Sequence, residues 1–200
     1  MTTASEVLSS IQSAFPGAVL DSRVESDRRL WATIDSKKIL DVCKHLTAKL
    51  NFDHYSGAAG LDWIARNEME VVEIMASHGA HNVVAMLKVK TPRDSPSVPS
   101  LVPLYWNADW YEREIWEMLG INFEGHPGLY PLLLSDPLVG VWPWRKDFKG
   151  YPDYTTGERA VAITTPEGYT EYYFPPTPAE VEAGTVPKER PQYPTFRERE

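Results

Sequence analysis

The sequence has almost no cysteine and little histidine. Cys43 is the only cysteine among 200 residues, which excludes a disulfide within the chain and any cluster ligated by several of its own cysteines. Of the five histidines, His78 and His81 are three residues apart, but they lie in a predicted turn and not on a helix face. No serine stands in a nucleophile elbow and no glycine-rich phosphate loop is present. We therefore predict no catalytic, metal-binding or cofactor-binding residues.

The sequence also lacks a surplus of basic residues and any long apolar run. A formal charge of −8 and a pI near 5.2 argue against a nucleic-acid partner, because binding phosphates needs a basic face. No stretch reaches the length of apolar residues that a membrane-spanning helix requires. The first residues have neither a basic start nor a long apolar stretch, so we expect no signal peptide.

Aromatic residues and proline are plentiful instead. Seven tryptophans, ten tyrosines and 17 prolines accompany a hydrophobic share of 42%, which is enough for a real core. Because Trp and Tyr are enriched at protein interfaces, this composition suits a chain that lies against other proteins.

The pattern of apolar residues predicts a small α+β domain. Helical spacing predicts helices over residues 3–15 and 37–50, with Asp35 or Ser36 as a cap of the second. We expect strands at 18–20 and 30–34 around a polar turn, one at 51–63 with glycine irregularities, and a hairpin of 69–77 with 82–90. A proline-rich loop over 92–103 follows. These elements predict a mostly antiparallel sheet with helices packed on one face.

The sequence changes character after this domain. We expect the domain to cover residues 1–130, an aromatic and basic docking segment to cover 131–157, and an extended proline-rich tail to cover 158–200. A hairpin is expected within the tail at "AVAITTPEGYTEYYF". Such a tail buries too little surface to order alone, so we expect it to wrap a neighbouring protein.

One stretch, "NADWYEREIWEMLGINFEGHP", predicts a well-specified helix with unusual charges. Asp109 and Glu112 fit a capping pair, Arg113 and Glu117 have the spacing of a helix ion pair, and Gly120 ends the helix. An apolar stripe provides the packing face; it comprises Ala108, Tyr111, Ile115, and Met118 or Leu119.

The charges of this helix allow three interpretations. They can form a solvated face, or they can dock on a partner. An independent enzyme is the third possibility, with Glu112 or Glu114 as a base and His126 as an acid.

A second stretch, "WPWRKDF", places basic residues among large aromatics. Arg145 and Lys146 stand beside Asp147 and between Trp144 and Phe148. The stretch fits either an aromatic loop anchor with solvated charges or an interface anchor, since Trp and Arg dominate binding hot spots.

Together these two stretches resemble the signature of the 30-kDa subunit family of respiratory complex I, the NADH-quinone oxidoreductase, and its relatives. The match includes Glu112 to Glu114, Gly120-Ile121, Glu124 to Pro127 and, more loosely, Gly140 to Phe148. The clear match covers residues 92–148. Tyr130 stands where the family usually has a basic residue or proline, and "VWPW" replaces a second His-Pro.

The resemblance implies a peripheral, non-catalytic subunit on the cytoplasmic side of a membrane or its matrix or stromal equivalent. It implies a hetero-oligomer with a large hydrogenase-like subunit and with iron–sulfur subunits that feed a quinone site, and no cofactor in this chain. Relatives serve NADH-, ferredoxin- or deazaflavin-linked dehydrogenases and membrane-bound hydrogenases, so the electron donor stays open. It also implies that these residues meet a partner: Glu112, Arg113, Glu114, Glu117, His126, Pro127, Trp142, Arg145, Lys146, Asp147 and Phe148.

Overall fold

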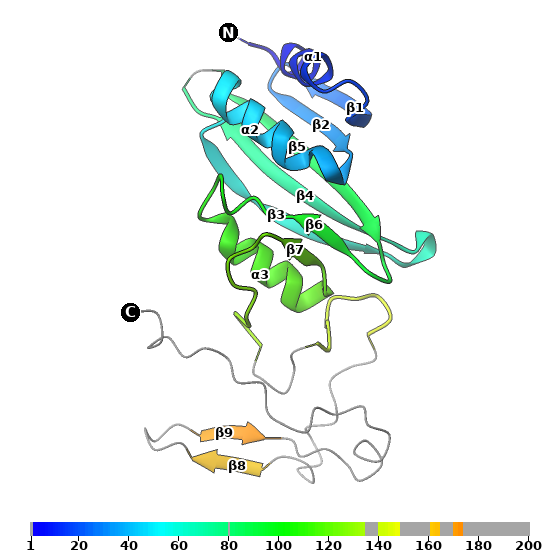
Figure 1. Cartoon of the computed structure of the whole chain (residues 1–200), viewed down its shortest axis with the longest axis vertical. Coiled ribbons are helices and arrows are strands. Elements are labelled where there is room, and N and C mark those ends of the chain that lie inside the picture. The colour runs from blue at the N-terminus through cyan, green and yellow to red at the C-terminus, as the bar shows by residue number, and fades with distance from the viewer. Residues whose placement is uncertain (1, 80, 135–139, 149–160, 165–169, 174–200) are drawn as a thin grey trace. The chain divides into compact units, whose positions relative to one another are not determined.

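A five-stranded mixed sheet is the centre of the fold in the computed structural model, which describes residues 2–79, 81–134, 140–148, 161–164 and 170–173 (Figure 1). Its strands lie in the order β1 (Val19–Ser26), β2 (Arg29–Ile34), β5 (Val83–Pro92), β4 (Glu68–Ser77) and β3 (His54–Trp63). Only β2 and β5 run parallel, and the other neighbours are antiparallel. The predicted α+β class and mostly antiparallel sheet are confirmed.

Three helices pack on this sheet. Helices α1 (Ala4–Ala14) and α2 (Ile39–Leu50) lie in front of the sheet in Figure 1, and α3 (Ala108–Leu119) packs on β3. Short 3₁₀ turns occupy η1 (Ser36–Lys38) and η2 (Ile64–Arg66). Alternate residues of the central strands face the helices, as the pleat requires, and are buried; they include Leu30, Ala32, Ile34, Ala85, Leu87 and Val89.

Side chains cap the starts of the first two helical segments, and Asp35 is one of the two caps that the sequence predicted for the second. The Thr3 side chain accepts a hydrogen bond from the Glu6 amide, and the Glu6 carboxylate accepts one from the Thr3 amide. Asp35 accepts from the Lys37 amide and begins η1, which leads into α2. Each bond satisfies an amide that has no partner within the helix itself.

The polar stretch after residue 20 is not the predicted turn. It forms most of β1, and only a short connection separates β1 from β2. The prediction was wrong because β1 is an edge strand whose side chains are almost all exposed on both faces. Such a strand carries no alternation of apolar and polar residues that would reveal it.

The proline-rich loop also contains structure that the sequence did not predict. Residues Ser97–Pro99 form β6, which pairs in parallel with β7 (Asn122–Glu124) beyond α3. Both strands have three residues, which is too short for a periodic signal.

The second unit of the chain comprises residues 136–138 and 150–200, and two short strands of it are described. Strands β8 (Val161–Thr164) and β9 (Thr170–Tyr173) pair antiparallel, which confirms the predicted hairpin. The rest of the predicted tail lies outside the described residues, so its wrapping of a neighbour stays a prediction. Within the described residues, no helix has the length and apolar character needed to cross a membrane.

Candidate functional site

The charged helix α3 begins differently from the prediction. Its N-cap is Asn107, whose side chain makes no capping bond and instead donates to the Tyr55 carbonyl of β3 at 3.0 Å. The predicted capping pair of Asp109 and Glu112 is therefore wrong. The predicted end is confirmed, since Gly120 adopts the left-handed conformation with φ of 75°.

Glu112 is fully buried beneath the loop that precedes α3. Its Oε1 accepts the Leu101 amide at 2.6 Å, which fixes the loop against the helix. Burial raises the pKa of the Glu112 carboxyl to about 7, against the hydrogen bonds from Ser100 and Leu101 that favour its charged form. The role of Glu112 in this structure is therefore to hold the preceding loop against the helix.

Arg113 connects α3 to the segment that follows β7. Its guanidinium donates to the Tyr130 carbonyl at 3.1 Å and to the Pro131 carbonyl at 2.9 Å. The same group lies 3.7 Å from the centre of the Tyr130 ring. Its Nη1 also forms an ion pair with Asp109 Oδ2 at 3.5 Å. A planar fork with five donors is well suited to this combination of carbonyls and a ring face.

Glu117 holds the same segment one turn further along the helix. Its two carboxylate oxygens accept the amides of three successive residues, Leu132, Leu133 and Leu134, at 2.8 to 3.2 Å. Glu117 does not form the predicted pair with Arg113. The chain itself therefore satisfies the charges of Arg113 and Glu117, and their expected contact with a partner stays a prediction.

His126 stabilises the turn after β7. Its Nδ1 accepts the Gly128 amide at 3.0 Å, so the proton of the neutral ring lies on Nε2, which faces Asp109 at 3.4 Å. The side chain is fully buried, and burial lowers the pKa of His126. Pro127 beside it is exposed.

The "WPWRKDF" segment caps the C-terminal end of α3. The Trp144 amide donates to the Met118 carbonyl at 3.0 Å, and the Arg145 side chain donates to the Leu119 carbonyl at 2.8 Å. Arg145 also lies 4.0 Å from the centre of the Trp142 ring. These donors satisfy helix carbonyls that have no partner within the helix.

An ion-pair hub joins this segment to the sheet. Arg93 donates to both oxygens of Asp62, at 2.8 and 3.0 Å, and also to Asp147 at 2.5 Å. The Lys146 amide donates to the same Asp62 at 2.8 Å. The bond from Arg93 lowers the pKa of Asp62. Sequence reasoning missed Asp62 and Arg93, because they are 31 residues apart and have no motif.

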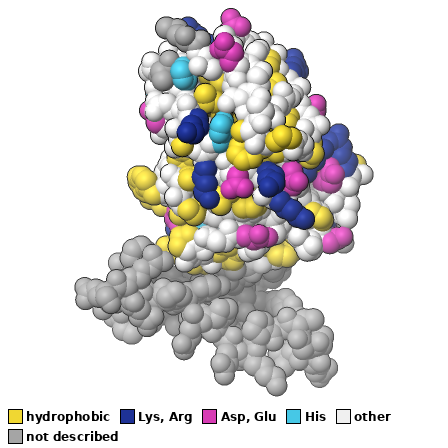
Figure 2. Space-filling model, turned by 45° about the horizontal axis from the view of Figure 1, so that its top comes forward, with side chains coloured by type: hydrophobic (Ala, Val, Ile, Leu, Met, Phe, Trp, Pro, Cys, Tyr) yellow, Lys and Arg dark blue, Asp and Glu magenta, His cyan; other side chains and the backbone are white. Residues whose placement is uncertain are grey.

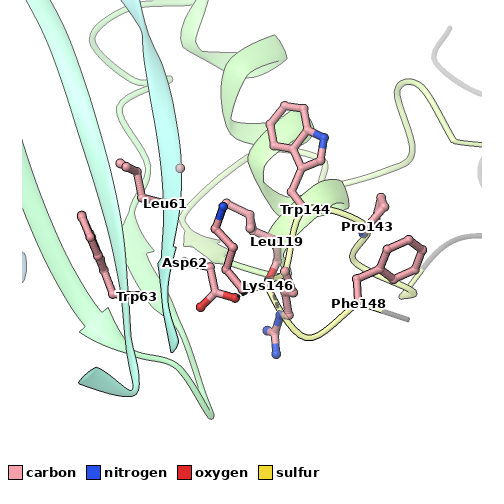
Figure 3. A pocket seen from close by; sticks show the side chains of 10 residues that line it. Leu61, Asp62, Trp63, Leu119, Pro143, Trp144, Lys146 and Phe148 are labelled. Carbon is pink, nitrogen blue, oxygen red and sulfur yellow. Dashed lines mark hydrogen bonds between the residues drawn. The ribbon is translucent and has the colours of Figure 1, made fainter. Parts of the chain in front are cut away.

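Next to the hub lies a groove of about 690 Å³ (Figure 3). Its lining comprises residues 60–63 of β3, Leu119 at the end of α3, and Pro143, Trp144, Arg145, Lys146 and Phe148 of the following segment. A smaller groove of about 350 Å³ lies beside β1 and β2. The three residues of the alternative active site, Glu112, Glu114 and His126, line neither groove.

Large aromatic side chains are exposed at the start of α3. Trp106 is 79% exposed and Trp110, one helical turn away, is 63% exposed. In Figure 2, hydrophobic side chains lie among charges of both signs over the visible face of the first unit. Exposed tryptophans of this size are typical of interaction surfaces.

Two features decide what the site can do chemically. Glu112 and the His126 side chain are buried and hydrogen-bonded to the backbone, so neither reaches a substrate in this arrangement. Across the described residues, no three His, Cys, Asp or Glu side chains gather as they would around a metal ion. The exposed groove and the exposed tryptophans are instead suited to binding another protein.

Comparison with known proteins places these features in one family. The pattern described as the 30-kDa subunit of respiratory-chain NADH dehydrogenase matches residues 32–154. The chain is 45% identical over 149 residues to the C subunit of the F(420)H(2) dehydrogenase of Methanosarcina mazei, covering 74% of this chain and 94% of the relative. It is 31% identical over 149 residues to the C subunit of the NADH-quinone oxidoreductase of Salinispora tropica, covering 72% of this chain. Here the chain spans 60% of the relative's length.

Two solved structures share the fold. One belongs to the "membrane-bound sulfane sulfur reductase (MBS), an archaeal respiratory membrane complex", with 28% identity and a TM-score of 0.64 over 72% of this chain and 84% of the other. The second is a trypsin-resistant fragment of Nqo5, with 22% identity and a TM-score of 0.53 over 62% of this chain and 98% of the other. The second likeness concerns the fold alone.

Proposed function

The chain belongs to the 30-kDa subunit family of respiratory-chain NADH dehydrogenase, and from this premise we propose that it is a non-catalytic, peripheral subunit of a complex I-like oxidoreductase at a membrane. In this proposal it supports electron transfer through iron–sulfur subunits to a quinone-type acceptor, coupled to proton translocation. The observation that carries it is the 45% identity to a dehydrogenase subunit over 94% of that subunit's length.

The electron donor is the finer part of the proposal. The 45% identity to a subunit of F420H2 dehydrogenase exceeds the 31% identity to a subunit of NADH-quinone oxidoreductase over the same number of residues. This difference favours the deazaflavin-linked alternative, in which the complex oxidises reduced F420. An NADH-linked complex is the second candidate.

The proposed partners are a large hydrogenase-like subunit and the iron–sulfur subunits of the same complex. The clusters belong to those partners, and this chain supplies binding surface on the cytoplasmic side of the membrane. Several residues expected at the interface keep exposed surface, including Pro127, Trp142, Trp144 and Lys146. Trp106 and Trp110 add a second exposed patch.

Purification of the native assembly tests this proposal. An affinity tag on this chain should bring down a membrane-associated complex whose other subunits carry iron–sulfur clusters, as mass spectrometry and iron analysis would show. The complex should oxidise F420H2 faster than NADH with a quinone analogue as acceptor. Recovery of the chain alone, in a soluble form with its own activity, would favour the independent enzyme.

A further inference from the structure

The two edges of the sheet differ in how they are protected. Strand β1 is one edge and carries Asp21, Arg23 and Glu25, all exposed, with two irregularities in its register. Strand β3 is the other edge; its only acid, Asp62, is held by Arg93. Charges and irregularities are the features that keep an edge from pairing with another chain. Strand β3 has one irregularity, near its beginning, and no free charge along its second half.

The larger groove runs along this less protected edge. Successive side chains of a strand point to opposite faces of a sheet, yet residues 60–63 of β3 all line the groove. The hollow therefore wraps around the strand edge and does not lie on one face. Figure 3 shows Leu61 and Trp63 on one side of the strand and Asp62, Lys146 and Trp144 on the other.

The groove combines aromatic surface with one unpaired positive charge. Trp63 is 38% exposed and Trp144 is 48% exposed. Arg145 is engaged by the Leu119 carbonyl and Asp147 by Arg93, whereas the exposed Lys146 ammonium forms no ion pair within the described residues. An incoming carboxylate would complete this set of charges.

We propose that the β3 edge at residues 60–63 receives an extended, acidic segment of a neighbouring subunit by β-strand addition. Backbone hydrogen bonds to the free edge hold the segment, an apolar side chain packs against Trp63 or Trp144, and a carboxylate binds Lys146. This inference rests on the proposed function, because the segment belongs to another subunit of the same complex.

Hydrogen exchange tests the backbone part. The amides of residues 57–63 that do not bond β4 should exchange rapidly in the isolated full-length chain and slowly in the purified complex. Peptides from β1 serve as the internal control for an edge that stays open. Equal exchange of residues 57–63 in the two states, in a complex that contains the chain, would overturn the inference and leave the proposed function standing. Failure of the chain to co-purify with any complex would overturn both.

Charge reversal tests the Lys146 contact. Lys146→Glu should weaken rebinding of the purified chain to chain-depleted complex about tenfold, whereas Lys44→Glu, an exposed lysine on α2, should leave it unchanged. Equal binding of both variants would contradict the acidic segment.

Cross-linking identifies the occupant. Ala59→Cys places an exposed thiol on β3 and Ser22→Cys places one on β1, while the native Cys43 is buried. With a thiol-attached photoreactive benzophenone, which inserts into C–H bonds of whatever chain lies beside it, only Ala59→Cys should capture an acidic segment of another subunit. Capture of a second copy of this chain, or no capture by Ala59→Cys, would refute the proposal.

Discussion

At the scale of single residues, the most unusual group is the Glu73 carboxyl in the middle of β4. It is fully buried, and Tyr55 donates to its Oε2 at 2.5 Å while its Oε1 has no partner among the described residues. Burial raises the pKa of Glu73 to about 8, assisted by the nearby Glu112. The folded chain therefore holds a proton at Glu73 near neutral pH that the unfolded chain releases.

Glu73→Gln should reduce the pH dependence of stability. Because the folded pKa lies above the unfolded value of 4.5, the stability that Glu73 contributes is fully present below pH 4.5 and is lost as the pH rises to about 8. In this window the free energy of unfolding should fall by roughly 1 kcal/mol per pH unit, to which Glu112 adds in the same direction. Denaturant unfolding of both chains at pH values of about 5.5 and 7.5, inside this window, measures the slope, and an identical slope would contradict the argument.

Arg113 has contacts within the chain in addition to the partner contact predicted for it. Sequence reasoning assigned it to a partner, but its donors reach Tyr130 and Pro131 of the same chain. Arg113→Ala should therefore lower the stability of the isolated chain by about 2–3 kcal/mol. Arg113→Lys should lose nearly as much, because an ammonium cannot reproduce the bonded fork or the stacking on Tyr130.

Thermal unfolding of the isolated chain checks both variants. Glu114→Ala, one position away on the same helix and without a hydrogen bond or ion pair in the described part of the chain, is the matched control and should keep the melting temperature. An Arg113→Ala chain that melts normally but fails to assemble would contradict the structural role and support the predicted contact with a partner.

At the scale of elements, the end of α3 depends on a glycine that lies against a tryptophan. A Cβ built on Gly120 would lie 2.5 Å from the Trp142 ring, and the backbone there has φ of 75°. Trp142 itself has φ of 50°, which a bulky residue rarely adopts, so its packing must hold it there. The packing of the capping segment on α3 therefore depends on the absence of a side chain at Gly120.

Gly120→Ala should weaken the packing of the capping segment on α3. We expect a loss of about 2–3 kcal/mol from backbone strain and the displaced Trp142, and faster tryptic cleavage after Arg145 and Lys146. Gly17→Ala is the control, because Gly17 has a similar φ of 81° but an open space around its Cβ, so only the strain of about 1 kcal/mol applies. Equal losses in the two variants would show that the Trp142 contact is unimportant.

Some elements of the fold could be predicted from the sequence and others could not. Helices α1, α2 and α3 were predictable because burial on one face leaves a period in the sequence, and the β4–β5 hairpin was predictable because two β-branched runs flank a turn. Strand β1 and the β6–β7 pair were not, since an exposed edge and a three-residue strand leave none. The partners of Glu117 and Asp62 were also beyond prediction, because amides far along the chain satisfy them and no side-chain pattern records that.

At the scale of the whole molecule, many charges of the α3 motif face inward, whereas Trp106 just before the helix and Trp110 in its first turn face outward. The charges of α3 hold the loop before it and the segment after it, as the contacts of Glu112 and Arg113 show. This internal frame keeps Trp106 and Trp110 exposed at the start of the helix. The surface available to a partner here is therefore aromatic, and buried polar contacts of α3 hold the chain beneath it.

A double substitution of these tryptophans should separate assembly from folding. Trp106→Ser with Trp110→Ser removes two side chains that are 79% and 63% exposed, so the melting temperature of the isolated chain should change by less than the equivalent of about 0.5 kcal/mol. If the pair is buried against a neighbouring protein of the complex, its loss should weaken assembly by about 2–4 kcal/mol, measured as the amount of complex on a native gel. Leu20→Ser on β1, where the side chain is 65% exposed, controls for the loss of exposed apolar surface and should assemble normally. Normal assembly of the double variant would mean that this face stays in solvent, and the groove beside β3 would then remain as the contact to examine.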